Sequence, residues 1–388
     1  MKKNKSKKPV TEVLLMGTPS KNSDLLWFTG FNASDPFPAF SAHGKKIGLI
    51  PLLEVGRAKK ESHLDEILNL TEIIKDLRKT NPRAGIADAI VLAALNEGIE
   101  TFRVPEDFPI GLYNHLQSLG LKLIPFSEND KIPLFRNRTI KTKKEIAGIK
   151  KGNVAASAGF LRVEEILKET EIASSKKLFW KGQKLTAEIL KDEIQVAVTR
   201  AGGLLDIGLI CAPGDQAIDC HSSGTGPITA GQLIVVDIFP RDRESFNYGD
   251  MTRTYLKGKA SAQQRKLVET VLEAQRRALK SIKDKKSGAS IHQQVVDFFN
   301  KKGYRTKKTK AGYEGFFHGT GHGLGFDIHE EPSLSSRHTK PLLPGECVTV
   351  EPGLYYLGLG GCRIEDCVLI TKKGCEMLSK HPYEWEIP

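Results

Sequence analysis

Acidic side chains follow two strongly apolar runs of this 388-residue chain. Asp237 comes directly after residues 233–236, and Glu351 after residues 348–350. A carboxylate at the end of a buried strand is costly unless a cation or hydrogen bonds compensate it. We therefore expect a cationic group beside both. Acidic or imidazole side chains and glycines gather in residues 220–224, 236–237, 249–253 and 318–323, and at Glu351 and Glu365.

Four of these acids, Asp237, Asp250, Glu351 and Glu365, together carry a charge of −4, which two divalent cations would neutralise. Carboxylates with one imidazole favour hard ions such as Mn²⁺ or Mg²⁺, with Co²⁺ or Zn²⁺ as further options. The glycines around His322 let the backbone approach closely and aim the imidazole at the acids. The pattern predicts two ions about 3.5–4 Å apart that share a bridging water.

Four blocks in this order resemble the pita-bread metallopeptidases: GDMTRT at 249–254, HGTGHG with DIHE at 318–330, VEPG at 350–353 and GCRIED at 361–366. That family includes proline dipeptidases, Xaa-Pro aminopeptidases, methionine aminopeptidases and creatinase. The blocks span roughly residues 140–388. Residues 25–31, LLWFTGF, resemble the creatinase-type N-terminal domain, which methionine aminopeptidases usually lack.

The resemblance implies a role for each matching residue. Glu351 would be both a metal ligand and the general base toward the bridging water. His221, His318 and His329 match histidines that stabilise the tetrahedral intermediate or hold the residue after the scissile bond. The implied metal ligands are Asp237, Asp250, His322, Glu351 and Glu365.

Two arginines are candidate substrate-binding residues. Arg363 and Glu365 are two apart in an expected strand and so would share a face, where Arg363 either orients Glu365 or meets substrate. Arg337 lies fourteen residues before Glu351, where some proline dipeptidases place an arginine for the substrate carboxylate; an exposed loop arginine is the alternative.

The spacing of the first two ligands departs from the family. Twelve residues separate Asp237 from Asp250, two more than in the most common pattern. We expect a loop insertion there, with Asp242 as the alternative first ligand.

The expected elements place these residues on an α/β (α+β) fold. The first part alternates strands and helices, and the second shows the order helix, helix, strands twice. This predicts a basic tail at 1–9, a creatinase-like α/β domain at 10–138, and a pita-bread domain at 139–388 with a mostly antiparallel curved sheet flanked by helices. The expected strands are 13–16, 25–28, 47–50, 121–125, 207–211, 233–238, 251–256, 347–350 and 364–370, and the expected helices are 64–77, 111–119, 144–168, 186–200, 262–283 and 290–302, the last capped by Ser290.

The net charge of +12 is concentrated in two short segments. Residues 1–8 carry five lysines and residues 301–310 carry six basic residues, and neither segment contains an acid. Together they supply +11, so the other 370 residues are nearly neutral. We therefore expect no nucleic-acid partner. The basic segment 301–310 precedes His318, so it is expected to flank the mouth of the site.

We predict a metal-dependent exopeptidase that hydrolyses the bond before proline in a peptide substrate, as a proline dipeptidase or an Xaa-Pro aminopeptidase. The resemblance also implies a homodimer. No apolar run is long enough for a membrane span, and six cysteines without a CxxC pair fit a reduced, cytoplasmic protein. The alternatives are a metal-free relative that binds nucleic acid or protein, and creatinase-like amidine hydrolysis.

Overall fold

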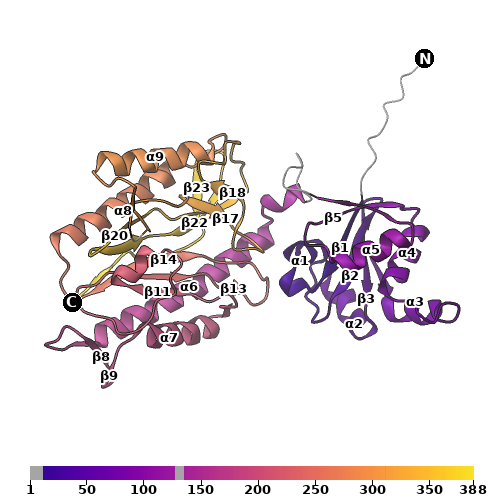
Figure 1. Cartoon of the computed structure of the whole chain (residues 1–388), viewed down its shortest axis with the longest axis horizontal. Coiled ribbons are helices and arrows are strands. Elements are labelled where there is room, and N and C mark those ends of the chain that lie inside the picture. Colours follow the sequence, from indigo (N-terminus) through magenta and orange to yellow (C-terminus); the bar gives the residue numbers. More distant parts are fainter. Residues whose placement is uncertain (1–11, 127–134, 311) are drawn as a thin grey trace, which may run out of the picture. The chain divides into compact units, whose positions relative to one another are not determined.

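The computed structural model describes residues 12–126, 135–310 and 312–388. The chain divides into two compact units, Met1–Arg138 and Thr139–Pro388 (Figure 1). The predicted basic tail at 1–9 lies outside the described residues. Within the described ranges, no helix is both long enough and apolar enough to cross a membrane.

The first unit is built on a mixed six-stranded sheet with the strand order β4-β3-β2-β1-β5-β6. Adjacent residues of a strand point to opposite faces, so Leu14 joins one core with Ile90, and Leu15 joins another with Phe28. The strands are β1 Glu12–Gly17, β2 Phe37–Ala42, β3 Lys45–Ile50, β4 Glu66–Asn69, β5 Thr101–Val104 and β6 Lys122–Pro125, and the helices are α1 Ser23–Thr29, α2 Leu52–Glu61, α3 Leu70–Leu77, α4 Ile86–Asn96 and α5 Ile110–Ser118.

Two predicted elements of this unit are wrong. Residues 25–28, expected as a strand, lie in α1, because the Asn22 side chain accepts a hydrogen bond from the Leu25 N–H (2.8 Å) and Gly30 ends the helix in the left-handed conformation. The expected helix 64–77 is β4 followed by α3, since Asn69 caps a helix that begins only at Leu70. The pattern also missed β2, α2, α4 and β5.

The second unit contains two main sheets, a four-stranded sheet in the order β11-β12-β14-β24 and a five-stranded sheet in the order β18-β17-β19-β22-β23. Its helices are α6 Lys143–Glu169, α7 Ala187–Arg200, α8 Ala262–Ser281 and α9 Gly288–Lys301. The sheet strands are β11 Ile210–Pro213, β12 Ile234–Ile238, β14 Met251–Lys257, β17 Gly321–Gly323, β18 Glu330–Leu334, β19 Cys347–Val350, β22 Asp366–Ile370, β23 Cys375–Met377 and β24 Glu386–Ile387. Shorter pairings involve β7 Glu171–Ile172, β8 Leu178–Trp180, β9 Gln183–Lys184, β10 Gly203–Leu204, β13 Arg241–Asp242, β15 Lys307–Thr309, β16 Gly312–Glu314, β20 Gly353–Tyr356 and β21 Gly360–Arg363.

Each sheet has its own pair of helices. Helices α6 and α7 share a core with β12, and α8 and α9 share a core with β19 and β22. The strands are antiparallel apart from the β14–β24 pair, which confirms the predicted mixed fold with a mostly antiparallel sheet. A hydrogen bond from the Glu365 N–H to the Thr252 carbonyl (3.0 Å) joins the two sheets. The candidate acids lie along this junction.

Several boundaries in this unit differ from the prediction. The expected strand 207–211 is β11, which runs from Ile210 to Pro213. Helix α9 begins earlier than expected, with Ser287 as its N-cap; the Ser287 hydroxyl accepts a hydrogen bond from the Ser290 N–H (3.2 Å). Strand β21 ends at Arg363 and β22 begins at Asp366, so Arg363 and Glu365 do not lie on one strand.

Candidate metal centre

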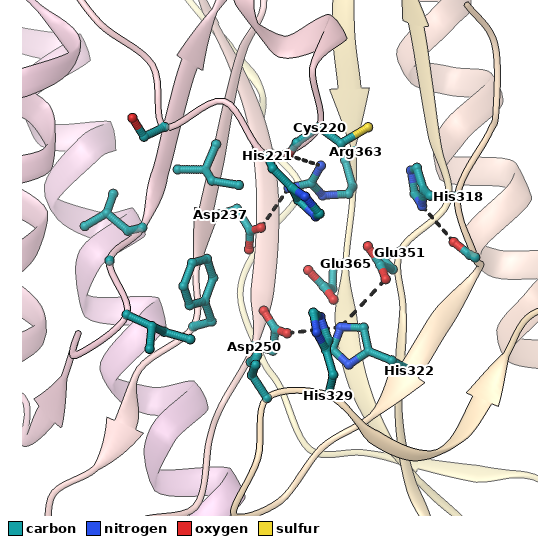
Figure 2. A pocket seen from close by; sticks show the side chains of 18 of the residues that line it. Cys220, His221, Asp237, Asp250, His318, His322, His329, Glu351, Arg363 and Glu365 are labelled. Atoms are coloured by element: carbon teal, nitrogen blue, oxygen red, sulfur yellow. Dashed lines mark hydrogen bonds and ion pairs between the residues drawn. The ribbon is translucent and has the colours of Figure 1, made fainter. Parts of the chain in front are cut away.

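A cavity of about 680 Å³ in the second unit brings nearly all of the predicted site residues together (Figure 2). They come from both sheets and from the loops between their strands. Arg337 does not line the cavity; it is exposed in the turn after β18. The predicted residues in the lining are Asp237, Asp250, His322, Glu351, Glu365, His221, His318, His329 and Arg363.

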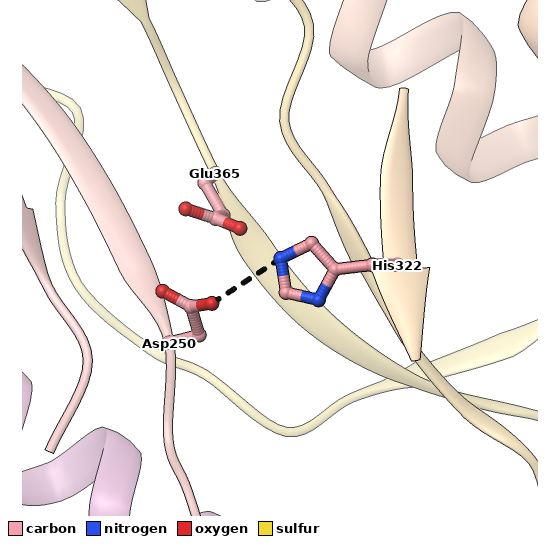
Figure 3. Close-up of side chains that lie close together, drawn as sticks. All are labelled: Asp250, His322 and Glu365. Carbon is pink, nitrogen blue, oxygen red and sulfur yellow. Dashed lines mark ion pairs between the residues drawn. The ribbon is translucent and has the colours of Figure 1, made fainter. Parts of the chain in front are cut away.

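Asp250, His322 and Glu365 offer ligand atoms within 4.8 Å of one another (Figure 3). The Nε2 atom of His322 lies 3.5 Å from Asp250 Oδ2 and 3.7 Å from Glu351 Oε1. Asp237 Oδ1 and Glu365 Oε1 are buried without a hydrogen-bond partner among the described residues. Buried carboxylate oxygens without partners are expected where a cation completes the site, so these residues fit divalent metal ions.

The electrostatics support the same conclusion. Burial and the neighbouring carboxylates raise the pKa of Asp250 and of Glu365 well above the usual range. Burial raises the pKa of Glu351 to about 8. Burial lowers the pKa of His322 to about 3, so its imidazole is neutral, as a metal ligand must be. Its Nδ1 faces the Gly323 carbonyl (3.1 Å), which leaves Nε2 toward the acids.

Helix α6 positions Asp250 through a close backbone contact. A side chain at Gly152 would meet the Gly249 nitrogen at 2.4 Å, so only glycine lets the helix come this near. The buried Asn153 therefore accepts a hydrogen bond from the Asp250 N–H (3.0 Å) through its side-chain oxygen. Sequence reasoning missed Asn153, which lies in an otherwise ordinary helical pattern.

The glycines beside His322 also have a steric reason. A Cβ at Gly321 would lie 1.9 Å from the Thr349 carbonyl oxygen, and one at Gly323 would lie 2.5 Å from that of Glu330. These contacts let β17 sit between β18 and β19, and the Thr349 hydroxyl accepts a hydrogen bond from the His322 N–H (3.2 Å).

Arg363 pairs with Asp237 rather than with Glu365. One guanidinium nitrogen donates to Asp237 Oδ2 (2.7 Å), and Nε donates to the Thr252 hydroxyl (3.1 Å). That hydroxyl in turn donates to Glu365 Oε2 (2.8 Å), so Thr252 links Arg363 to Glu365 by hydrogen bonds, in addition to the direct attraction between the two charges. Sequence reasoning missed Thr252, although its position two residues after Asp250 in a strand pattern could have indicated it.

The three histidines surround the acids. The His329 ring packs edge-on against His322, with centroids 4.3 Å apart, and burial lowers its pKa. His221 is exposed at the rim. His318 Nε2 lies 3.0 Å from the hydroxyl of the buried Tyr355, and Nδ1 lies 2.7 Å from the Gly319 carbonyl oxygen. No pattern in the sequence pointed to Tyr355.

The side chain of Asp242, the alternative first ligand, is hydrogen-bonded within a turn. Its carboxylate accepts hydrogen bonds from the N–H (2.9 Å) and the hydroxyl (2.7 Å) of Ser245, and Arg241 pairs with Tyr248 across the loop. The extra residues between Asp237 and Asp250 thus form a hairpin that leaves both acids at the cavity.

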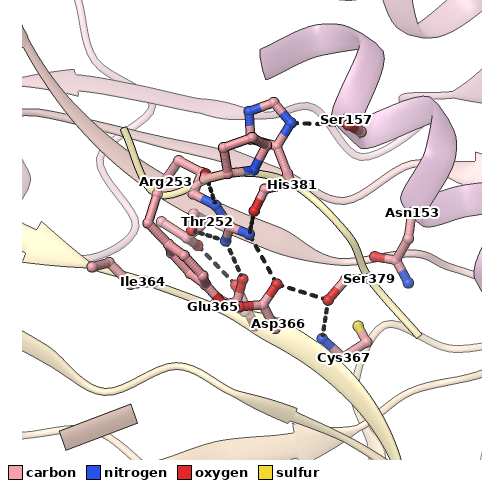
Figure 4. Close-up of polar contacts among 12 residues, drawn as sticks. Asn153, Ser157, Thr252, Arg253, Ile364, Glu365, Asp366, Cys367, Ser379 and His381 are labelled. Atoms are coloured by element: carbon pink, nitrogen blue, oxygen red, sulfur yellow. Dashed lines mark hydrogen bonds and ion pairs between the residues drawn. The ribbon is translucent and has the colours of Figure 1, made fainter. Parts of the chain in front are cut away.

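A buried ion pair stabilises the junction between the two main sheets (Figure 4). Arg253 donates to the Glu365 carbonyl (2.6 Å) and to Asp366 Oδ1 (2.9 Å). Asp366 also accepts hydrogen bonds from the side chains of Gln275 (2.9 Å), Ser379 (2.8 Å) and Tyr383 (2.6 Å). The network fixes the backbone that carries Glu365.

Replacing Asp366 by Ala is expected to lower the free energy of unfolding by about 3–5 kcal/mol, because it leaves Arg253 buried and unpaired. The side chains of this pair are 3% and 1% exposed. The control is Glu376→Ala, which breaks the 46% and 54% exposed pair with Lys150 and should cost under about 1 kcal/mol. Equal losses in urea unfolding of the two variants would contradict the role given to the network.

The site is a carboxylate-rich centre for divalent cations, built where two antiparallel sheets meet. Residues 147–372 match the model of metallopeptidase family M24. Because this match spans more than half of the chain, the protein belongs to that family and is a metallopeptidase. The resemblance drawn from the four sequence blocks is confirmed.

Relatives and solved structures agree with this assignment. The Xaa-Pro dipeptidase of Pyrococcus horikoshii is 28% identical over 337 residues, which cover 85% of this chain and 83% of the relative. That of Pyrococcus furiosus is 32% identical over 249 residues, 63% of this chain and 64% of the relative. The structure of an X-Pro aminopeptidase from Thermotoga maritima superposes with a TM-score of 0.78 at 23% identity and covers 97% of each chain. This likeness shows a shared fold over both units.

Proposed function

We propose that the protein is an exopeptidase that hydrolyses the bond before proline, and that its centre holds two divalent ions, with Mn²⁺ as the physiological metal. The observation that carries the proposal is the convergence of Asp237, Asp250, His322, Glu351 and Glu365 on one cavity. The names of the two Pyrococcus relatives support the substrate class, and carboxylate-rich ligation supports a hard ion. A metal-free binding module is not favoured, because such a role needs none of these buried acids.

Bound divalent ions would polarise the scissile carbonyl and lower the pKa of a bound water. Glu351 lines the cavity, with Oε1 3.7 Å from His322 Nε2, and suits the role of a base that takes a proton from the attacking water and passes it to the prolyl nitrogen. His221 and His329 lie at the cavity as donors for the developing oxyanion.

His318 is suited to lining the proline pocket. Burial lowers its pKa to about 3, so the ring is neutral and carries one N–H. With that N–H on Nδ1 donating to the Gly319 carbonyl, Nε2 accepts from the Tyr355 hydroxyl. Both ring nitrogens are then used, and the ring presents its carbon edge to the apolar proline.

Arg337 is not part of the proposed substrate site. It is exposed and lies outside the cavity, which favours an exposed loop arginine, so Arg363 is the arginine that we propose to contact the substrate.

Two further parts of the proposal concern the whole protein. We propose a homodimer, as the family resemblance implies, and a cytoplasmic location, which the six free cysteines support.

The test is cleavage of Ala-Pro, Ala-Pro-Ala and Ala-Gly-Ala by the Mn²⁺-loaded protein. We expect hydrolysis of at least one of the two proline peptides and at least about 100-fold slower cleavage of Ala-Gly-Ala. Cleavage of the tripeptide selects an aminopeptidase, and cleavage of Ala-Pro alone selects a dipeptidase. Equal cleavage of the proline and glycine tripeptides would contradict the substrate class.

A further inference from the structure

The basic segment between α9 and His318 forms a two-faced hairpin. Strands β15 and β16 pair Lys307 with Glu314 and Lys308 with Tyr313. Cross-strand partners share a face, so Lys308 and Tyr313 lie on one face of the hairpin and Lys307 and Glu314 on the other. After β16 ends, the Phe317 ring packs against that of Tyr313. Phe316 is buried in the core, whereas Phe317 lines the cavity. The face with Tyr313 and Lys308 therefore continues the cavity wall.

Two aromatic rings connect the cavity with this face. The Phe317 ring lies 5.4 Å from that of Tyr355 and 6.2 Å from that of Tyr313, measured between centroids. Gly315, between Tyr313 and Phe317 in the chain at φ +99°, is a position that only glycine fits, because a Cβ there would lie 2.7 Å from Thr306 Cα and 2.8 Å from the Arg305 carbonyl oxygen. Its N–H donates to the Tyr355 carbonyl (2.9 Å), which ties the hairpin to β20. Phe317 and Tyr313 are 37% and 52% exposed, so both offer apolar surface.

The two lysines of β15 differ in their partners. Lys307 forms an ion pair with Glu314 (3.0 Å), whose carboxylate also accepts from the Leu357 N–H. Lys308, on the other face beside Tyr313, is exposed and forms no ion pair within the described part of the chain. Its ammonium group is thus available to a ligand carboxylate beyond the rings of Phe317 and Tyr313.

We propose that Phe317, Tyr313 and Lys308 form a subsite for the carboxyl-terminal part of a peptide longer than a dipeptide. This inference rests on the proposed function and adds a substrate class. A peptide carries a positive amino end and a negative carboxyl end, and the six basic residues at 301–310 attract only the latter. The rings pack on the residues after proline, and Lys308 pairs with the terminal carboxylate or an acidic side chain.

The distances set the peptide length. The two rings are 6.2 Å apart, and the Cβ atoms of a cross-strand pair such as Tyr313 and Lys308 are about 5 Å apart. Together these two distances span about 11 Å from Phe317 to Lys308. An extended peptide advances about 3.3 Å per residue, so about three residues beyond proline bring its carboxylate to Lys308. Ala-Pro-Gly-Gly-Gly is therefore the matching probe.

The experiment compares kcat/KM for this pentapeptide as the free acid and as the C-terminal amide, at low salt. We expect the free acid to be preferred about fivefold, as for an exposed ion pair. In Lys308→Gln the preference should fall to near one. Lys307→Gln, with the same charge change on the opposite face, should keep it. No preference in the unmodified protein, or equal losses in both variants, would overturn the subsite.

Failure of the subsite and failure of the proposed function give different results. Cleavage of Ala-Pro with neither cleavage nor binding of the pentapeptides overturns the subsite alone. If no proline peptide is cleaved, calorimetric binding of Pro-Gly-Gly-Gly as acid and as amide still tests Lys308, because it needs no turnover. Tighter binding of the acid that depends on Lys308 supports the subsite, and equal binding rejects it.

Discussion

Glu365→Gln is expected to abolish metal binding and peptide hydrolysis together. The change preserves the shape of the side chain but removes one of the carboxylates that compensate a cation. Loss of partners outside the ligand set typically weakens metal affinity 10- to 100-fold, so loss of a ligand should exceed about 100-fold. Mn²⁺ affinity by calorimetry and kcat/KM on the proline peptides provide the measurements. Glu376→Gln, which removes an exposed acid of the same unit, is the matched control.

The same variant separates loss of function from loss of fold. Burial raises the pKa of Glu365, so the ionised carboxylate is unfavourable in the metal-free protein. Glu365→Gln should therefore leave the metal-free protein at least as stable as the unmodified chain at pH 8 while it removes stabilisation by Mn²⁺. Retained turnover, or inactivity explained by unfolding, would refute the assignment. Asp250→Asn should behave in the same way, because its acid lies in the same group.

The metal-free protein is expected to lose stability between pH 5.5 and 8.5. The folded-state pKa values of Asp250, Glu351 and Glu365 are raised above their unfolded values, that of Glu351 to about 8. The folded state thus binds more protons than the unfolded state in this range, so stability is greatest below the unfolded pKa values and falls as the pH rises.

Mn²⁺ should reverse this loss, and more strongly at the higher pH, because the ligands bind as carboxylates. At 100 times its dissociation constant the ion adds about 2.7 kcal/mol, which raises Tm by roughly 5–10 °C for a domain of this size. Thermal unfolding at pH 5.5 and 8.5, with and without Mn²⁺, measures both effects. The pH effect should be smaller in Glu365→Gln. Metal protection that does not increase with pH would contradict the buried-acid centre.

The metal ligands could be predicted from sequence because each acid lies in or beside an apolar strand. A buried carboxylate there costs free energy unless a cation or hydrogen bonds stabilise it. Asp237 and Glu351 show this directly. The close backbone approach at the glycines beside His322 could also be predicted, and the structure places carbonyl oxygens where their side chains would lie.

Other features depend on contacts between distant segments. Asn153 holds Asp250 only because two glycines, 97 residues apart in the chain, meet. The Tyr355 hydroxyl accepts a hydrogen bond from Arg363 (3.1 Å) and lies 3.0 Å from His318 Nε2, and the sequence around Tyr355 indicates neither partner. The apolar run at 25–28 fits a strand or a buried helix equally well, and the Asn22 and Gly30 caps decide in favour of the helix.

The central claim is that hydrolysis before proline depends on metal held by the buried acids. The most direct test measures Ala-Pro and Ala-Pro-Ala hydrolysis by one protein sample before chelation, after chelation and after return of Mn²⁺, with metal content determined at each step. We predict that activity disappears with the metal and returns as about two ions per chain are bound. Full activity in the chelated protein, with no metal detected, would contradict the account.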